Sequence, residues 1–108
     1  MPDAGDIAYL DFDPQMGREQ ARRRPALVLT PSRYNSAAGL ALVVPITSRV
    51  KGYPFEISVD HGLPVQGVIL ADQVKSLDWQ ARRFEFVCRA GKVMLRRTRQ
   101  LVGELLGI

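Results

Sequence analysis

The side chains best suited to chemistry in this sequence stand at the ends of apolar segments. Arg24 directly precedes Pro25 and an apolar run, and Glu19 lies five residues before Arg24. Thr47 follows a second apolar run, and Asp72 interrupts a third. A guanidinium neutralises charge on a phosphate, a hydroxyl hydrogen-bonds a phosphate oxygen and a carboxylate accepts a proton. If the strands are neighbours, these residues form a set suited to phosphoryl chemistry; the alternative is that they are ordinary polar groups of the surface.

Arg24 belongs to a basic segment that ends at a proline. Arg18, Arg22 and Arg23 precede it, so we expect an electropositive loop that attracts polyanions. Pro25 fixes its own φ and favours an extended Arg24. Arg24 is therefore the charged residue nearest to a rigid strand, whereas the three preceding arginines are predicted to steer or bind the polyanion.

Composition indicates an ordinary globular protein with a basic surface. The 108 residues suffice for one domain, predicted to span residues 1–108, and 46% hydrophobic with 24% charged residues is typical of a folded chain. The formal net charge is +4, and basic residues are concentrated at 18–24 and 82–99. A basic face suits a nucleic acid or an acidic protein segment, although a merely solvated surface is the alternative.

Several site types are excluded by the residue inventory. His61 is the only histidine, so neither a paired-histidine ribonuclease nor a Ser-His-Asp triad can be built from one chain. We expect it to be a solvated loop residue. The sequence has no GxxxxGK[ST] or GxGxxG motif and no ligand-spaced cluster of Cys, His and carboxylates, so we expect no nucleotide cofactor and no metal.

The subcellular location predicted from the sequence is the cytoplasm. No apolar run approaches the roughly 20 residues of a membrane span, and the N-terminal MPDAGD lacks the features of a signal peptide. Cys88 is the only cysteine, which fits a reducing compartment, and its apolar surroundings favour a packed thiol over a nucleophile.

Short apolar runs alternate with turns until a helical period begins near Val93. We expect a mostly β fold, either a small curled antiparallel sheet or an SH3-like barrel, with a C-terminal amphipathic α-helix stopped by Gly107. A turn of helix is expected at 32–39. The expected strands are 6–12, 25–30, 40–46, 55–59, 67–71 with 74–77, and 84–88.

Four separated segments carry a resemblance to a known family. They are GDIAYLDFDPQMGREQARRRPALVLTPSRYN at 5–35, PITS at 45–48, KGYPFE at 51–56 and GVILADQVKSLDW at 67–79. In this order and spacing they closely resemble the MazF/PemK family of toxin endoribonucleases. The resemblance implies an SH3-like barrel of the MazF/CcdB type, a homodimer, and metal-independent cleavage of single-stranded RNA at short recognition sequences. It also implies 2′,3′-cyclic phosphate and 5′-hydroxyl products, and a cognate antitoxin whose acidic, disordered tail occupies the RNA groove.

The resemblance also assigns roles to residues. It places the family's catalytic arginine at Arg24, its catalytic threonine at Thr47 and its proposed glutamate, the candidate general base, at Glu19. Some relatives have Arg-x-Asp at the polar break, whereas here Leu70 takes the place of that arginine. This departure weakens an acid/base role for Asp72, which we instead expect to bond loop backbone.

Further RNA contacts are expected from polar and aromatic residues around these motifs. Tyr34, Tyr53 and Phe55 are candidates for base stacking, with packing in the core or in turns as the alternative. Trp79 is expected to be a scaffold or interface residue. The helix arginines are expected to lie on the solvent-exposed face of the C-terminal helix; they are Arg96, Arg97 and Arg99. The RNA-contact candidates, each of which could equally be solvated, are Ser48, Arg49, Lys51, Asp72, Gln73 and Lys75.

Two other functions stay open at this point. One is a non-enzymatic toxin of the same fold, like the gyrase-binding CcdB branch, which is not expected to keep the pair Arg24 and Thr47. The other is an RNA-binding barrel without chemistry, suggested only by the basic charge. Fold alone does not distinguish these two functions from that of a toxin endoribonuclease.

Overall fold

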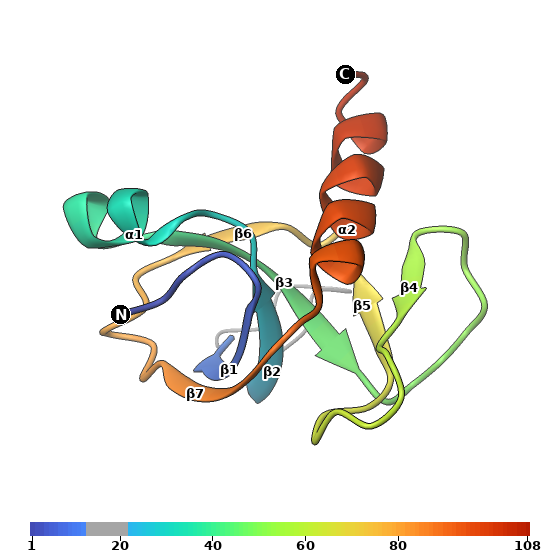
Figure 1. The fold of residues 1–108 in the computed structure, drawn as a ribbon, viewed down its shortest axis with the longest axis horizontal. Helices are drawn as coiled ribbons and strands as arrows, with labels where there is room; N and C mark the ends of the chain where they lie inside the picture. The colour runs from blue at the N-terminus through green and yellow to red at the C-terminus, as the bar shows by residue number, and fades with distance from the viewer. Residues whose placement is uncertain (13–21) are drawn as a thin grey trace.

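The computed structural model describes residues 1–12 and 22–108. Within these ranges, seven strands and two helices follow one another (Figure 1). They are β1 (Asp6–Asp11), β2 (Arg23–Val28), α1 (Ser32–Ala38), β3 (Ala41–Thr47), β4 (Glu56–Ser58), β5 (Val68–Leu70), β6 (Lys75–Leu77), β7 (Glu85–Arg89) and α2 (Lys92–Leu105).

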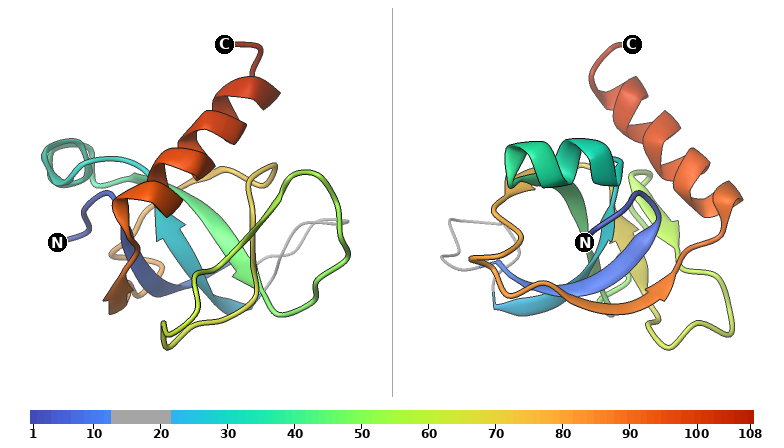
Figure 2. Two further views of the ribbon diagram at one scale, coloured as in Figure 1. Left: turned by 45° about the vertical axis from the view of Figure 1, so that its right-hand side comes forward. Right: turned by 60° about the vertical axis from the view of Figure 1, so that its left-hand side comes forward.

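The strands form one antiparallel sheet with β3 as its shared member. The order is β4-β5-β3-β2-β1-β7, and β6 pairs with the first half of β3 while β5 pairs with its last residues. The sheet curls strongly in both views of Figure 2. Among the described residues, the end strands β4 and β7 do not pair with each other, so the sheet is open where a closed barrel was one of the expectations.

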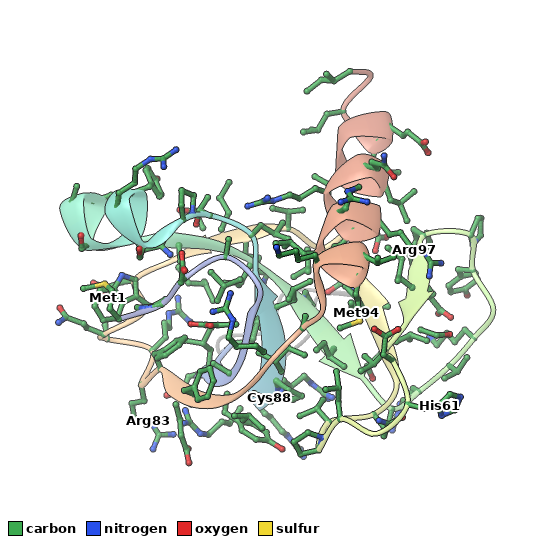
Figure 3. The ribbon with its side chains drawn as sticks, viewed as in Figure 1. Met1, His61, Arg83, Cys88, Met94 and Arg97 are labelled. Carbon is green, nitrogen blue, oxygen red and sulfur yellow. The ribbon has the colours of Figure 1, made fainter. Side chains whose placement is uncertain are left out.

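Both faces of the central strands are buried, because β2 and β3 contribute alternate residues to two apolar clusters. Leu27 and Val44 pack in one cluster, which α2 covers through Met94. Figure 3 shows Met94 at the base of α2, directed toward the sheet. Val28 and Val43 pack in the other cluster, against which Trp79 and Phe84 lie. The strand expected at 40–46 is thus confirmed with bounds one residue later, since β3 runs from Ala41 to Thr47 and Leu40 is exposed.

β2 begins earlier than its sequence indicated. The predicted strand was 25–30, whereas β2 runs from Arg23 to Val28, so Arg24 lies within the strand opposite Leu10 of β1. Pro25, which seemed to mark the strand start, is paired with Tyr9. In an antiparallel pair, only alternate residues exchange backbone hydrogen bonds with the partner strand. A proline such as Pro25 is therefore tolerated at a paired position where its missing N–H is not required.

The C-terminal helix is fixed to the sheet at one end. Met94 and Thr98 are buried, as expected of an amphipathic helix, but Leu105 is half exposed where the helix stands away from the sheet (Figure 1). Arg99 was expected on the wet face, yet its guanidinium donates two hydrogen bonds, of 2.6 and 3.2 Å, to the Leu29 carbonyl. Neither helix in the described part of the chain is long and apolar enough to cross a membrane.

A charged cluster joins β1, β2 and β7 at the edge of the sheet. Arg83 donates two hydrogen bonds, of 2.7 and 2.9 Å, to the Asp11 carboxylate. Arg23 binds the same carboxylate at 3.3 Å and Glu85 at 2.9 Å. The hydrogen bonds from Arg83, supported by the one from Arg23, lower the pKa of Asp11 to about 2.

We predict that this cluster makes stability depend on pH in the acid range. A carboxyl whose pKa is depressed by folding stabilises the native state above its unfolded pKa, near 4, and loses that contribution as the pH falls toward the folded value of about 2. The stability difference between the wild type and Asp11→Asn, measured by urea unfolding, should therefore shrink between about pH 4 and pH 2. Arg83→Gln should reduce the same pH dependence, and a difference that stays constant with pH would contradict this role.

Candidate functional site

Arg24 and Thr47 lie on the same face of the sheet, at adjoining strand ends. The β2–β3 register pairs Val28 with Val43 and Ala26 with Pro45. The pairing ends at Ala26 and Pro45, and Arg24 and Thr47 each lie two residues beyond it on their own strand. Alternation along a strand puts each of them on the same face as the paired residue two positions away. The strand pairing therefore directs both residues toward the same end and the same face of the sheet.

The Thr47 side chain is buried and held in place. Only 4% of the residue is exposed, and its Oγ1 accepts a hydrogen bond of 3.2 Å from the Arg49 backbone N–H. A hydroxyl that accepts one bond still has its own hydrogen to donate. Thr47 therefore offers a donor of fixed position at the end of β3.

Gly67 lets the chain pass close to Thr47. It has φ +123°, and a Cβ built on it would overlap the Thr47 carbonyl oxygen and lie 2.9 Å from the carbonyl carbon. The next residue, Val68, pairs with Thr47 across β5 and β3. Sequence reasoning placed Gly67 at a strand start without any link to Thr47, because a close approach of backbones leaves no local signal.

A glutamate outside the predicted site organises the β3–β4 loop (residues 48–55). The Glu56 carboxylate accepts backbone hydrogen bonds from Gly52 at 2.9 Å and from Lys51 at 3.3 Å. Glu56 is also paired with Leu70 of β5. Alternation along the segment 55–59 indicated that Glu56 points away from the core, but not that it binds its own loop.

Asp72 occupies the turn between β5 and β6. Asp72 is exposed, yet desolvation by the surrounding protein raises the pKa of its carboxyl, and the neighbouring Glu56 carboxylate raises it further. Leu70, which stands where some relatives have an arginine, is buried in β5. The two carboxylates therefore lie near each other beside the loop that follows Thr47.

The predicted arginines differ in their surroundings. Arg22 is exposed with a left-handed φ of 64°, and Arg24 is half-buried. The Arg23 guanidinium is engaged with Asp11, with Glu85 and, at 2.8 Å, with the Arg83 carbonyl. Arg23 thus joins strands, and its predicted contact with RNA stays a prediction. Arg18 and Glu19 lie outside the described residues.

The remaining RNA-contact candidates fall into two groups. Ser48, Arg49 and Lys51 are exposed in the β3–β4 loop, next to Thr47 in sequence. Lys75 lies in β6 opposite Val43, four residues before Thr47, or about 13 Å along a strand. Gln73, half-buried, is in the same turn as Asp72 and donates its backbone N–H to the Leu70 carbonyl at 3.1 Å.

Other side chains are placed much as their sequence context indicated. His61 is exposed in a turn at the edge of the molecule (Figure 3). Cys88 packs against the apolar cluster that contains Met94, and burial raises the pKa of its thiol. Trp79 donates its indole N–H to the Asn35 carbonyl at 3.0 Å, a scaffold role. The described residues contain no group of three or more His, Cys, Asp or Glu that could hold a metal ion.

Comparison with known proteins identifies the family of the chain. The family model of the PemK-like, MazF-like toxin of type II toxin-antitoxin systems matches residues 3–106. The Endoribonuclease toxin MazF of Escherichia coli K12 is 55% identical over 82 residues, covering 76% of this chain and 73% of that protein. The chain belongs to this toxin family, as its motifs indicated.

Solved structures agree as well. A crystal structure of MazF from Deinococcus radiodurans has a TM-score of 0.96 and 50% identity, covering 99% of this chain and 97% of that one. A MazE-MazF crystal structure from the same organism has a TM-score of 0.87 and 46% identity, covering 99% and 96%. These matches confirm the predicted fold class, a mostly antiparallel β fold with a C-terminal helix.

We predict that the missing side chain at position 67 is needed for the geometry around Thr47. Gly67→Ala should destabilise the protein by roughly 1–3 kcal/mol more than Gly62→Ala, because overpacking is added to backbone strain. Gly62 is a matched control: it also has a positive φ, +89°, but no atom lies within 4 Å of an added Cβ. Urea unfolding gives the two free energies, and equal losses would show that the close approach is unimportant.

Proposed function

We propose that this protein is a toxin that cleaves single-stranded RNA endonucleolytically at short recognition sequences, without a metal or other cofactor. The observation that carries the proposal is that Arg24 and Thr47 lie at the same end of the paired strands β2 and β3, each two residues beyond the pair of Ala26 with Pro45, in a member of this toxin family. A guanidinium and a hydroxyl on neighbouring strand ends suit a phosphodiester, which offers negative oxygens to both.

The reaction proposed is transesterification within the RNA. The ribose 2′-oxygen attacks the adjacent phosphorus in line as its proton leaves, and the bond to the 5′-oxygen of the next nucleotide breaks. The leaving 5′-oxygen takes a proton from water, so a 2′,3′-cyclic phosphate and a 5′-hydroxyl result. Arg24 stabilises the charge on the phosphorane, Thr47 donates a hydrogen bond to a phosphate oxygen, and Glu19 accepts the 2′-OH proton. The role of Glu19 rests on the family resemblance.

The electrostatic role of Arg24 is preferred to proton transfer. A guanidinium keeps its proton under ordinary conditions, so it is a poor acid toward a leaving oxygen but a strong fixed charge. The exposed Ser48, Arg49 and Lys51 extend positive and polar groups from Thr47 along the β3–β4 loop, where the rest of the RNA strand would bind.

Two protein partners are included in the proposal. The first is a cognate antitoxin with an acidic, disordered tail that competes with RNA for the basic surface, supported by the match to MazE-MazF complexes. The second is another copy of the chain, because α2 and the residues that follow it expose apolar side chains that a homodimer would cover. These are Val93, Leu105, Leu106 and Ile108.

We predict that Arg24→Ala abolishes RNA cleavage in the presence of EDTA. Removal of one preorganised charge-stabilising group typically lowers kcat by about 10²–10³, and Arg24→Lys should restore activity only in part because a point charge replaces a bidentate one. The measurement is cleavage of a long single-stranded RNA followed by sequencing of the new 5′ ends, which gives the activity, the end chemistry and the recognition sequence. Arg33→Ala, at an exposed position of α1, is the control.

The same assay separates the competing functions. Retained cleavage by a folded Arg24→Ala protein would remove Arg24 from the mechanism. RNA left intact by the wild type after long incubation would favour a CcdB-like protein ligand, and salt-sensitive binding without cyclic-phosphate ends would favour a plain RNA-binding protein.

A further inference from the structure

The β3–β4 loop presents an exposed aromatic ring, that of Tyr53, which packs against the ring of Phe55. Half of Tyr53 is exposed. Its ring lies over the Phe55 ring with centroids 5.2 Å apart and planes inclined by 32°. The Lys51 ammonium lies 6.0 Å from the Tyr53 ring centroid, at the outer limit of a cation–π contact.

The backbone around this ring is tied on both sides. Glu56 accepts the N–H groups of Lys51 and Gly52 through its carboxylate and donates its own N–H to the Tyr53 carbonyl at 3.1 Å. The Phe55 carbonyl accepts the N–H of Ala71 at 3.2 Å. The loop that carries Tyr53 is therefore bound to β4 and to the turn after β5, so little ordering remains for a ligand to impose.

The charge of the loop selects the kind of ligand. Arg49 and Lys51 are exposed in the same loop as Tyr53. Of the two carboxylates beside this loop, that of Glu56 is directed to loop backbone, and that of Asp72 belongs to the turn between β5 and β6. Positive groups combined with an exposed ring are the elements by which proteins hold single-stranded nucleic acid, with a base on the ring and phosphates on the cations.

We propose that Tyr53 is a stacking subsite for one unpaired RNA base, with Lys51 moving from the ring to the neighbouring phosphate. This rests on the proposed function, since it takes the RNA substrate as the ligand. In Figures 1 and 2 the loop leads away from the end of β3 toward β4. The base held by Tyr53 therefore belongs to a nucleotide outside the cleaved phosphodiester, and Tyr53 positions the substrate without taking part in the chemistry.

The first experiment measures binding without cleavage. A 2′-O-methyl form of an RNA that the wild type cleaves is titrated into each protein, because the methylated 2′-oxygen cannot attack. Tyr53→Ala should weaken binding by about 5- to 150-fold, the usual loss for one stacked base, and Tyr53→Phe should bind within about twofold of the wild type. Tyr34→Ala is the matched control, since Tyr34 is exposed on α1, on the other side of the molecule in Figure 1.

Two further readouts distinguish stacking from a structural role. With cleavable RNA, Tyr53→Ala should raise KM and leave kcat nearly unchanged, because the subsite lies away from the reacting phosphate. With a fluorescent 2-aminopurine placed in turn at each position flanking the cleavage point, the wild type and Tyr53→Phe should quench one position that Tyr53→Ala does not. Thermal unfolding checks that the variants are folded. If Tyr53→Ala does not fold, the quenching measured with the wild type still tests the proposal.

The outcomes that overturn the proposal differ from those that overturn the function. Unchanged RNA affinity in Tyr53→Ala, equal losses in Tyr53→Ala and Tyr53→Phe, quenching at no position, or a defect limited to antitoxin binding would each remove the stacking subsite while cleavage still stood. RNA that the wild type binds with a quenched position but never cleaves would remove the proposed nuclease and leave the subsite in place.

Discussion

The antiparallel pairing of β2 with β3 is the constraint on which the rest of the structure depends. Its register sends Leu27 and Val44 into one apolar cluster and Val28 and Val43 into the other, so the two clusters are fixed together. The same register carries the ends of both strands to a common point. Because a slip by one residue would exchange the faces of every side chain, the packing of the core also fixes the arrangement of the candidate site.

Alternation along β2 separates two adjacent arginines that look alike in the sequence. Arg23 joins β1, β2 and β7 through Asp11 and Glu85, whereas Arg24 lies on the opposite face, across from Leu10. A basic run is therefore not one surface: part of it stabilises the scaffold, and part is presented on the face that carries Thr47. The Arg24 guanidinium needs a rigid support to stay in position, and the ion pairs of Arg23 help to make β2 rigid.

Sequence reasoning reached the strand-end residues because local signals mark them. Proline after Arg24, an apolar run before Thr47 and a polar break at Asp72 are visible without a fold, and the family motifs agreed with them. The bonding of Glu56 to its loop and of Arg99 to the Leu29 carbonyl depends on where the chain returns, so neither was predicted. A proline is a usual signal for a strand boundary, but Pro25 is paired with Tyr9, so β2 starts two residues before it.

The contrast between Gly67 and Gly62 bears on how this chain can be altered. Both glycines adopt positive φ within the connection from β4 to β5, but open space surrounds only Gly62. A side chain added at Gly62 meets no atom within 4 Å, whereas one added at Gly67 meets the Thr47 backbone. The exposed part of that connection is thus a place to attach a label or a surface tether, and the variation among toxins of this family should be concentrated there.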